Sequence, residues 1–261
     1  MMAEARRRMV DDASAGGLAA VPDARGGADS LRSGIVRVCR RLHERGLIAG
    51  QDGNVSVRVG GNRILVTPAG FSKADLTEDD LVMLKLDGSR ISGRHEASSE
   101  VAMHLAAYRA RADVGAVVHA HPRAATAFAV AGEGLPADVL PELTVITGGV
   151  PLVPYATPGT AGLPAAMAEW LPNHDAFLLA NHGATTLGRT LAEAHQRMEA
   201  VEHCATILLT ARLLGRVNAL SADEVGVLLD ARRKVRTEHG RPAISGASPS
   251  GPSGAATRSE P

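Results

Sequence analysis

Hydrophobic residues recur with a helical period near the start of the chain and with a strand period shortly after it. From near Ser30 they fall three and four positions apart, which predicts a helix that stops at Gly46. Residues 54–59 and 63–67 alternate in character across a Gly-Gly-Asn turn, which predicts a β-hairpin. Residues 81–86 lead into an Asp-Gly turn and predict a third antiparallel strand.

The rest of the chain combines short apolar runs with longer amphipathic stretches. The β-branched run at 114–118 predicts one buried strand, and residues 175–180 predict another. Thr190 with Glu193 has the spacing of a capping box and marks the start of a long helix, and a second box at 221–224 starts the last one. The long helix covers about 191–214. The other predicted elements are helices at about 98–109, 122–131 and 165–171 and a short strand at 150–155.

Clusters of strands that alternate with helices predict an α/β fold, with one mixed, largely antiparallel sheet in a three-layer α/β/α arrangement. The two ends of the chain lack this patterning. Residues 1–28 are rich in Arg, Ala, Gly and Asp, and residues 240–261 are rich in Ser, Gly, Pro and Ala. We therefore expect two disordered tails around one domain at 29–239.

Charge and cysteine content narrow the classes of function. The 28 basic and 28 acidic side chains balance, so we expect neither nucleic acid nor a membrane surface as a partner. Cys39 and Cys204 fall within predicted helices, which argues against a disulfide framework and favours a reducing compartment. The sequence has no apolar run of membrane-spanning length and no signal-peptide pattern at its start. We expect a soluble, cytoplasmic protein.

Two histidines stand one residue apart at the end of the apolar run VVHAHP. Alternate residues of a strand point to the same face, so His119 and His121 converge on one position. Imidazole is a common ligand of zinc-like ions, and such a site needs at least one more ligand. His182, which follows the predicted strand at 175–180, can supply it. A lone His-x-His pair is as often structural as metal-binding, but the paired strand ends favour a metal here.

Ser98, Ser99 and Glu100 lie at the start of the helix predicted at about 98–109. Hydroxyls and free N–H groups at a helix start suit an anion such as phosphate. Ordinary helix capping explains the same residues and is the more frequent explanation of such a local sequence. Gly53 with Asn54, and Ala69 with Gly70, are two further candidates for anion contact. Turn formation explains both pairs equally well.

A competing histidine cluster lies on the predicted long helix. His195, Glu199 and His203 share one helical face, but they lack a His-Glu-x-x-His arrangement, so we interpret them as a solvated or subunit-facing stripe. The sequence contains no glycine-rich nucleotide fingerprint, so ATP and NAD are not indicated. The remaining histidines have no companions at ligand spacing, and we interpret them as ordinary polar residues: His43, His95, His104, His174 and His239.

Six motifs together resemble the class II aldolase/adducin family over about residues 30–238. They are GNVSVR at 53–58, TPAG at 67–70, SSE at 98–100, HAHP at 119–122, PYATPGT at 154–160 and NHG at 181–183. The family includes enzymes of carbohydrate metabolism such as L-fuculose-phosphate aldolase, which the chain resembles, and L-ribulose-phosphate 4-epimerase. The resemblance implies a homotetramer with active sites between subunits.

The same resemblance assigns roles to individual residues. His119, His121 and His182 match the ligands of a divalent metal, most often Zn²⁺, with Mn²⁺, Co²⁺ and Fe²⁺ as alternatives. Glu100 matches the acid/base residue, which also serves as a fourth ligand when no substrate is bound. The residues that match the cradle for the substrate phosphate are Gly53, Asn54, Gly70, Ser98 and Ser99.

These roles imply a metal-dependent aldolase that cleaves a small phosphorylated ketose to dihydroxyacetone phosphate and an aldehyde through a metal-stabilised enediolate. Two departures from the aldolase pattern bear on the substrate. Ala69 replaces a threonine of the phosphate loop, so one hydroxyl donor is missing. Glu142 stands where a neighbouring subunit contributes a tyrosine, and it is open to interpretation as an acid/base group across the interface or as a loop residue.

Two alternatives to an aldolase stay open. One keeps the metal and changes the reaction, because the family also contains epimerases, decarboxylases, dehydratases and oxygenases. The other is a non-catalytic assembly module like the adducin head domain. Such a module has no need of three histidines together with Glu100, which favours an enzyme.

Overall fold

The computed structural model describes residues 28–238 of the chain. Except for residue 28, the predicted tails at 1–28 and 240–261 lie outside the described residues. The boundaries of the domain at 29–239 stay a prediction.

Eight strands in the described part of the chain form one sheet. They are β1 (Asn54–Arg58), β2 (Arg63–Val66), β3 (Val82–Lys85), β4 (Arg90–Ser92), β5 (Ala116–Ala120), β6 (Leu152–Val153), β7 (Ala176–Leu179) and β8 (Gly183–Gly188). Their order across the sheet is β4-β3-β2-β1-β5-β8-β7-β6. All neighbours are antiparallel except β6 and β7, which are parallel. The predicted mixed, largely antiparallel sheet is confirmed.

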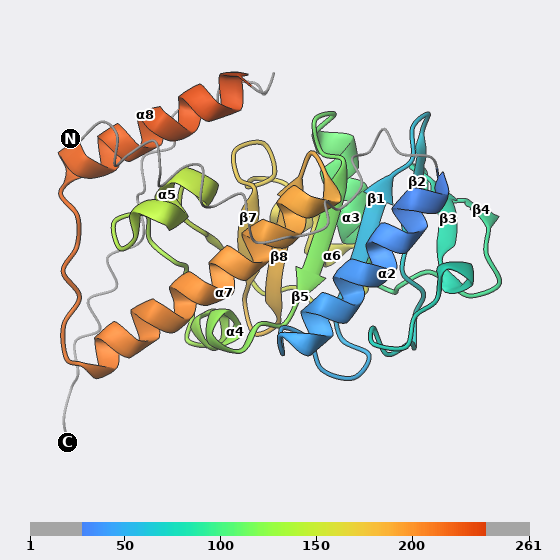
Figure 1. Cartoon of the computed structure of the whole chain (residues 1–261), viewed down its shortest axis with the longest axis horizontal. Coiled ribbons are helices and arrows are strands. Elements are labelled where there is room, and N and C mark those ends of the chain that lie inside the picture. Colours follow the sequence, from blue (N-terminus) through green and yellow to red (C-terminus); the bar gives the residue numbers. More distant parts are fainter. Residues whose placement is uncertain (1–27, 239–261) are drawn as a thin grey trace, which may run out of the picture.

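Helices cover both faces of this sheet (Figure 1). They are α2 (Ala28–Glu44), the 3-10 turn η2 (Glu78–Asp80), α3 (Val101–Ala110), α4 (Arg123–Val130), α5 (Pro141–Thr147), α6 (Gly162–Met167), α7 (Leu191–Leu213) and α8 (Ala222–Glu238). One face packs against α2, α4 and α7, and the other packs against α3 and α6. The predicted three-layer α/β/α fold is therefore confirmed.

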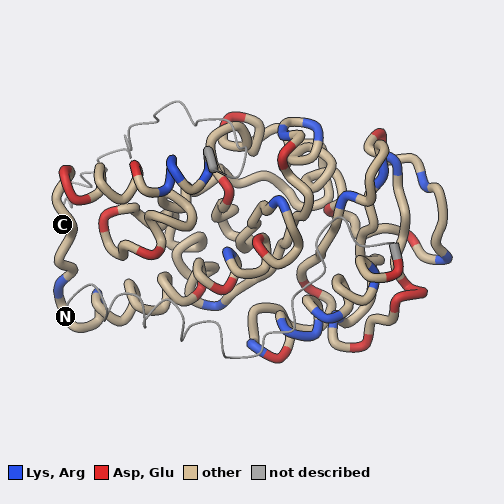
Figure 2. Tube along the Cα trace, turned by 45° about the horizontal axis from the view of Figure 1, so that its top comes forward, with Lys and Arg blue, Asp and Glu red and all other residues tan. Residues whose placement is uncertain are grey.

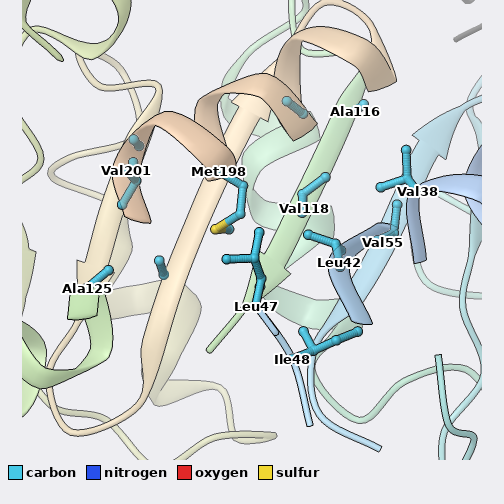
Figure 3. Close-up of a cluster of buried hydrophobic side chains, with 14 of the residues drawn as sticks. Val38, Leu42, Leu47, Ile48, Val55, Ala116, Val118, Ala125, Met198 and Val201 are labelled. Carbon is cyan, nitrogen blue, oxygen red and sulfur yellow. The ribbon is translucent and has the colours of Figure 1, made fainter. Parts of the chain in front are cut away.

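Strand β5 separates the two cores and orients the first histidine. Val118 packs with α2 and α7 in the larger core cluster, part of which Figure 3 shows. Val117 belongs to the second cluster, with α3 on the opposite face. Alternate residues of a strand share a direction, so His119 points to the same side as Val117. That side is where Glu100 precedes α3.

Four described elements are absent from the sequence prediction: η2, β4, α5 and β8. The sequence of β8, GATTLG, has no apolar run, although all six of its residues are buried between β5 and β7. Glycine is required at its start, because a Cβ on Gly183 would lie 2.6 Å from the Ala120 carbonyl oxygen. Pro141 and Glu142 open α5, so their interpretation as a loop is wrong.

Candidate metal centre and adjoining pocket

Three imidazoles meet at one end of the central strands. His119 lies within β5, His121 follows that strand, and His182 lies in the turn between β7 and β8. One ligand nitrogen from each residue lies within 4.8 Å of the others. Nε2 of His119 is 3.1 Å from Nε2 of His121. The structure thus brings together the strand ends that carry the predicted ligands.

Hydrogen bonds on the outer sides of two rings leave their inner nitrogens unprotonated. Nδ1 of His119 is 2.9 Å from the carbonyl oxygen of Ala184, which can only accept, so Nδ1 carries the proton. Nδ1 of His121 is 3.5 Å from a carboxylate oxygen of Asp52, which favours the same tautomer. Burial lowers the pKa of His119 to about 3 and keeps its ring neutral. Two lone pairs therefore face each other, an arrangement that suits a divalent cation.

Glu100 places its carboxylate against the same cluster. Its Oε1 is 3.0 Å from Nε2 of His182, and its Oε2 is 3.4 Å from Nε2 of His119. Asn54 donates a 2.9 Å hydrogen bond from Nδ2 to Oε2. Burial tends to raise the pKa of Glu100, but the hydrogen bonds from His182 and Asn54 hold that pKa well below its usual range. The carboxylate is therefore ionised and within reach of the predicted metal position.

The two serines before Glu100 do not cap α3. Glu100 itself is the N-cap residue, and it makes no side-chain capping bond. Instead, the hydroxyl of Ser98 accepts a 3.4 Å hydrogen bond from the backbone N–H of Glu100, and Ser99 is exposed. The capping interpretation of this segment is therefore wrong, and the Ser99 hydroxyl is available to a ligand.

A buried chain of hydrogen bonds fixes the orientation of Asn54. Nε2 of His104 lies 2.5 Å from Oδ1 of Asn54, so the ring donates to the amide oxygen. Nδ1 of His104 accepts from the hydroxyl of Ser56 at 2.7 Å, and that hydroxyl is 2.8 Å from the Tyr108 hydroxyl. Burial lowers the pKa of His104 to about 4. The interpretation of His104 as an ordinary polar residue is wrong, because it supports the amide that holds Glu100.

A pocket of about 220 Å³ adjoins the cluster. Glu100 and His121 lie on its wall, so the pocket opens toward the metal centre. Gly53 has a φ of +71°, and a Cβ there would lie 2.7 Å from the carbonyl oxygen of His119, which excludes larger residues. All five residues predicted to hold phosphate line the pocket: Gly53, Asn54, Gly70, Ser98 and Ser99.

Lys73 lines the same pocket and is absent from the sequence prediction. Its side chain is 2% exposed, and Nζ donates 2.9 Å hydrogen bonds to the carbonyl oxygens of Gln51 and Phe71. An ammonium has three N–H donors, so one is left over. Burial lowers the pKa of Lys73. One signal was available in the sequence: the chain has 25 arginines but only three lysines, and this one follows the TPAG motif closely.

The competing histidine stripe on α7 does not form a ligand cluster among the described residues. His195 is 3% exposed, so its interpretation as solvated is wrong. Its Nδ1 lies 3.5 Å from an oxygen of Glu199, as in an ordinary helical pair. His203 is exposed on the same helix, and His239 lies outside the described residues.

The predictions about cysteines and membrane spans can also be compared with the structure. Cys39 and Cys204 are both buried and free, as the sequence predicts. Within residues 28–238, every helix is too short or too polar to cross a bilayer. Acidic and basic positions are both distributed along the whole trace (Figure 2), in agreement with the balanced composition.

Comparison with known proteins identifies the family. Residues 33–209 match the family model described as the class II aldolase and adducin N-terminal domain. An L-fuculose phosphate aldolase of Methanococcus maripaludis is 35% identical over 173 residues, which cover 66% of this chain and 93% of that protein. A 3-oxo-tetronate 4-phosphate decarboxylase of Escherichia coli is 35% identical over 206 residues, which cover 76% of this chain and 95% of that protein.

Solved structures support the same assignment. The crystal structure of L-fuculose-1-phosphate aldolase from Thermus thermophilus superposes with a TM-score of 0.65 at 35% sequence identity. The matched region covers 73% of this chain and 98% of that one. Because the family model spans more than half of the sequence and the relatives are covered almost completely, the chain belongs to the class II aldolase/adducin family.

Proposed function

We propose that the chain is a metal-dependent aldehyde-lyase. It cleaves a small phosphorylated ketose, similar to L-fuculose phosphate, to dihydroxyacetone phosphate and an aldehyde. The observation that carries this proposal is the convergence of three imidazoles, two of which contact an ionised carboxylate, beside a pocket lined by anion donors. The 35% identity with an L-fuculose phosphate aldolase supports it independently.

Glu100 is the proposed acid/base group. Its ionised carboxylate lies between the imidazoles and the pocket, so it can accept the hydroxyl proton of a ketose whose carbonyl end lies beside the histidines. As the carbon–carbon bond breaks, the electron pair stays with the ketone fragment, and Glu100 returns the proton to its carbon. The hydrogen bond from Asn54, held in turn by His104, keeps the carboxylate in one orientation during both transfers.

The far end of the pocket is the proposed phosphate site. The Ser99 hydroxyl and the backbone N–H groups around Gly53 and Gly70 provide neutral donors. Lys73 provides the positive charge, which offsets the missing hydroxyl at Ala69. A phosphate held here lies away from the breaking bond, so its binding energy serves to orient the reacting carbons.

The metal itself is a proposal, and Zn²⁺ is the first candidate, with Mn²⁺, Co²⁺ and Fe²⁺ as alternatives. His119, His121 and His182 would hold the cation, with Glu100 as a fourth ligand in the absence of substrate. When bound, it would supply Lewis-acid stabilisation of the negative charge that develops on the ketone fragment. We further propose a cytoplasmic homotetramer with active sites between subunits, in which Glu142 from a neighbouring chain contacts the aldehyde.

Decarboxylation of a 3-oxo acid phosphate is the second candidate. The E. coli decarboxylase matches 76% of the chain, compared with 66% for the archaeal aldolase, at the same 35% identity. The chemistry is closely related, because an electron pair again develops beside a carbonyl when carbon dioxide, rather than an aldehyde, leaves. The replacement of the aldolase tyrosine by Glu142 also favours a different leaving group.

A substrate panel with product analysis tests both candidates. The purified protein is incubated with the phosphates of fuculose, rhamnulose, ribulose, a deoxypentulose and 3-oxo-tetronate, with and without chelator. We expect dihydroxyacetone phosphate and an aldehyde, loss of turnover with chelator, and recovery with added Zn²⁺. Release of carbon dioxide from the 3-oxo acid alone would select the second candidate. Turnover that chelator leaves unchanged, or a gently purified protein without metal, would contradict both.

A further inference from the structure

A second polar pocket lies at the end of the central strands opposite to the histidines. It has a volume of about 230 Å³ and is lined by residues of α5, α7 and α8 together with Arg189. Figure 1 shows where these three helices lie in the fold. Arg189 follows β8, whereas the histidines surround the start of that strand. The charged residues that line the pocket are Arg189, Arg197, Arg232, Arg236 and Glu193.

Beside this pocket, one carboxylate is shared among several guanidinium groups. Asp175 is fully buried at the start of β7. Its Oδ2 accepts a 2.8 Å hydrogen bond from Arg232 and another bond from Arg236. Nη2 of Arg197 is 3.6 Å from the same oxygen. Arg111 donates to the other oxygen, Oδ1, at 2.8 Å. Asp175 therefore forms ion pairs with four arginines at once.

The positive charges of this cluster outnumber the negative ones. Arg189 and the four arginines around Asp175 share three carboxylates, those of Asp113, Asp175 and Glu193, so the positive charges of the cluster exceed the negative ones by two among the described residues. Arg197, Arg232 and Arg236 are each at most 5% exposed. Buried charges are stable only when they are paired. The surplus of positive charge therefore favours the binding of an anion.

The cluster also has unused hydrogen-bond donors. Nε of Arg197 and Nε of Arg236 are buried and have no hydrogen-bond partner within residues 28–238. The guanidinium of Arg189 forms a 3.5 Å ion pair with Glu193, and its side chain is 36% exposed at the pocket. The neighbouring arginines repel Arg232. Burial and the charges of Arg236 and Arg197 lower its pKa to about 10, although the charge of Asp175 acts to raise it.

We propose that this pocket is a second anion site, separate from the proposed active site, and that it binds a small dianion of the phosphate or phosphate-ester class. A dianion matches the surplus of two charges, and planar guanidinium groups suit its oxygens. Val145, Ile146 and Val235 form an apolar wall that accommodates an organic group on a phosphate ester.

The position of the site suggests what binding does to the protein. Arg232 and Arg236 belong to α8, Arg197 belongs to α7, and α5 forms the third wall. An anion between them removes the repulsion that opposes the packing of α8. Bound anion therefore stabilises the attachment of the C-terminal helix to the rest of the domain.

Calorimetric titration of the full-length, metal-loaded protein with inorganic phosphate tests the proposal. The informative variant is Arg189→Gln, because Arg189 lines the pocket without contacting Asp175. The control for this variant is Arg212→Gln, which removes an exposed arginine of α7 that pairs with Glu133. Ser99→Ala removes one donor of the proposed active-site cradle, so that phosphate binding there can be distinguished from binding at the second site. We expect Arg189→Gln to weaken phosphate binding about tenfold in the Ser99→Ala background, and Arg189→Lys to retain most of it.

The outcomes separate this proposal from the proposed function. Loss of phosphate affinity in Ser99→Ala, but not in Arg189→Gln, would support the active-site cradle and overturn the second site. A change with Arg189→Gln alone would support the second site even if the aldolase proposal failed. If Arg189→Gln and Arg212→Gln bind phosphate with equal affinity, the second site is overturned. A change in oligomeric mass without a change in phosphate binding would also show that the surplus charge serves another purpose.

Discussion

The two ends of strand β7 carry polar clusters of opposite electrostatic character. At its start, guanidinium groups surround Asp175, and beyond its end His182 joins His119 and His121 in a group of three imidazoles that converge on one position. The strand between them, AFLL, is entirely buried and apolar. The same rigid element thus supports a cluster that suits a cation and a cluster that suits an anion.

The two clusters also differ in what their residues do for stability. The histidine cluster borders a pocket, and two of its imidazoles contact the carboxylate of Glu100, which also accepts a hydrogen bond from Asn54. The arginine cluster is held together by ion pairs from four segments of chain. We therefore expect substitutions at the histidine end to affect catalysis, and substitutions at the arginine end to affect folding.

The largest expected effect is on catalysis at the histidine end. Glu100→Gln keeps the shape of the side chain but removes the proposed proton carrier, so we expect kcat to fall by about 10²–10⁴-fold. The melting temperature and bound metal should stay close to those of the parent protein. Steady-state kinetics and metal analysis measure these quantities. Glu96→Gln is the control, because Glu96 is an exposed partner of Arg90. Equal kcat values for the two variants would exclude Glu100 as the acid/base group.

The corresponding change at the arginine end is Asp175→Asn. It leaves the buried guanidinium groups without their shared carboxylate, so we expect the free energy of unfolding to fall by about 3–5 kcal/mol. Asp230→Asn is the control, since Asp230 pairs with Arg233 on the exposed surface. Urea denaturation measures both variants. A loss for Asp175→Asn as small as that of the control would mean that the cluster contributes little to folding.

A smaller, pH-dependent effect is expected from the histidine that supports Asn54. His104 has a pKa of about 4 in the folded protein, lowered by burial from 6.5. Protonation thus favours the unfolded state, and stability falls as the pH drops below 6.5 toward 4. The full difference corresponds to about 3 kcal/mol.

Replacing this residue isolates its contribution. His104→Gln retains a donor toward Asn54 but does not titrate, so its stability deficit relative to the parent protein should shrink as the pH is lowered from neutrality toward the pKa of about 4. Chemical denaturation in the presence of chelator removes any contribution from metal release. His43→Gln, on the exposed side of α2, is the control. A deficit for His104→Gln that stays constant across this pH range would contradict the assignment.

Local patterns explain which parts of the fold could be predicted. The β1–β2 hairpin, β5, β7 and α7 each bury a face through residues close together in sequence, so periodicity indicates them. Strand β8 is different, because its burial comes from pairing with β5 and β7 on both sides. Its glycines and threonines form a buried strand only because they pair with β5 and β7, and β5 is distant in the sequence.

The same distinction applies to the two polar clusters. His119 and His121 are one residue apart at the end of a single strand, so the sequence indicates that they converge. The resemblance to a known family points to His182 and Glu100. The role of His104 depends on a contact with Asn54, which is 50 positions away. The arginine cluster joins residues from 111 to 236, and no motif relates them. Sequence reasoning finds sites contained in one segment and misses those that depend on tertiary packing.

The smallest expected effect concerns Lys73, which combines the characters of the two clusters: a buried cation, held as tightly as the arginines, that lines the pocket beside the histidines. If it supplies the charge for substrate phosphate, Lys73→Met should raise KM by about 10–100-fold, the equivalent of one charged hydrogen bond, and lower kcat less.

The control for this prediction is Lys85→Met, which changes an exposed residue of β3. If Lys73 only ties the carbonyls of Gln51 and Phe71 together, the variant should lose stability, while KM and competitive inhibition by inorganic phosphate stay at the values of the control. Comparing that inhibition with the unfolding free energy of both variants therefore decides whether this residue belongs with the binding groups or with the structural ones.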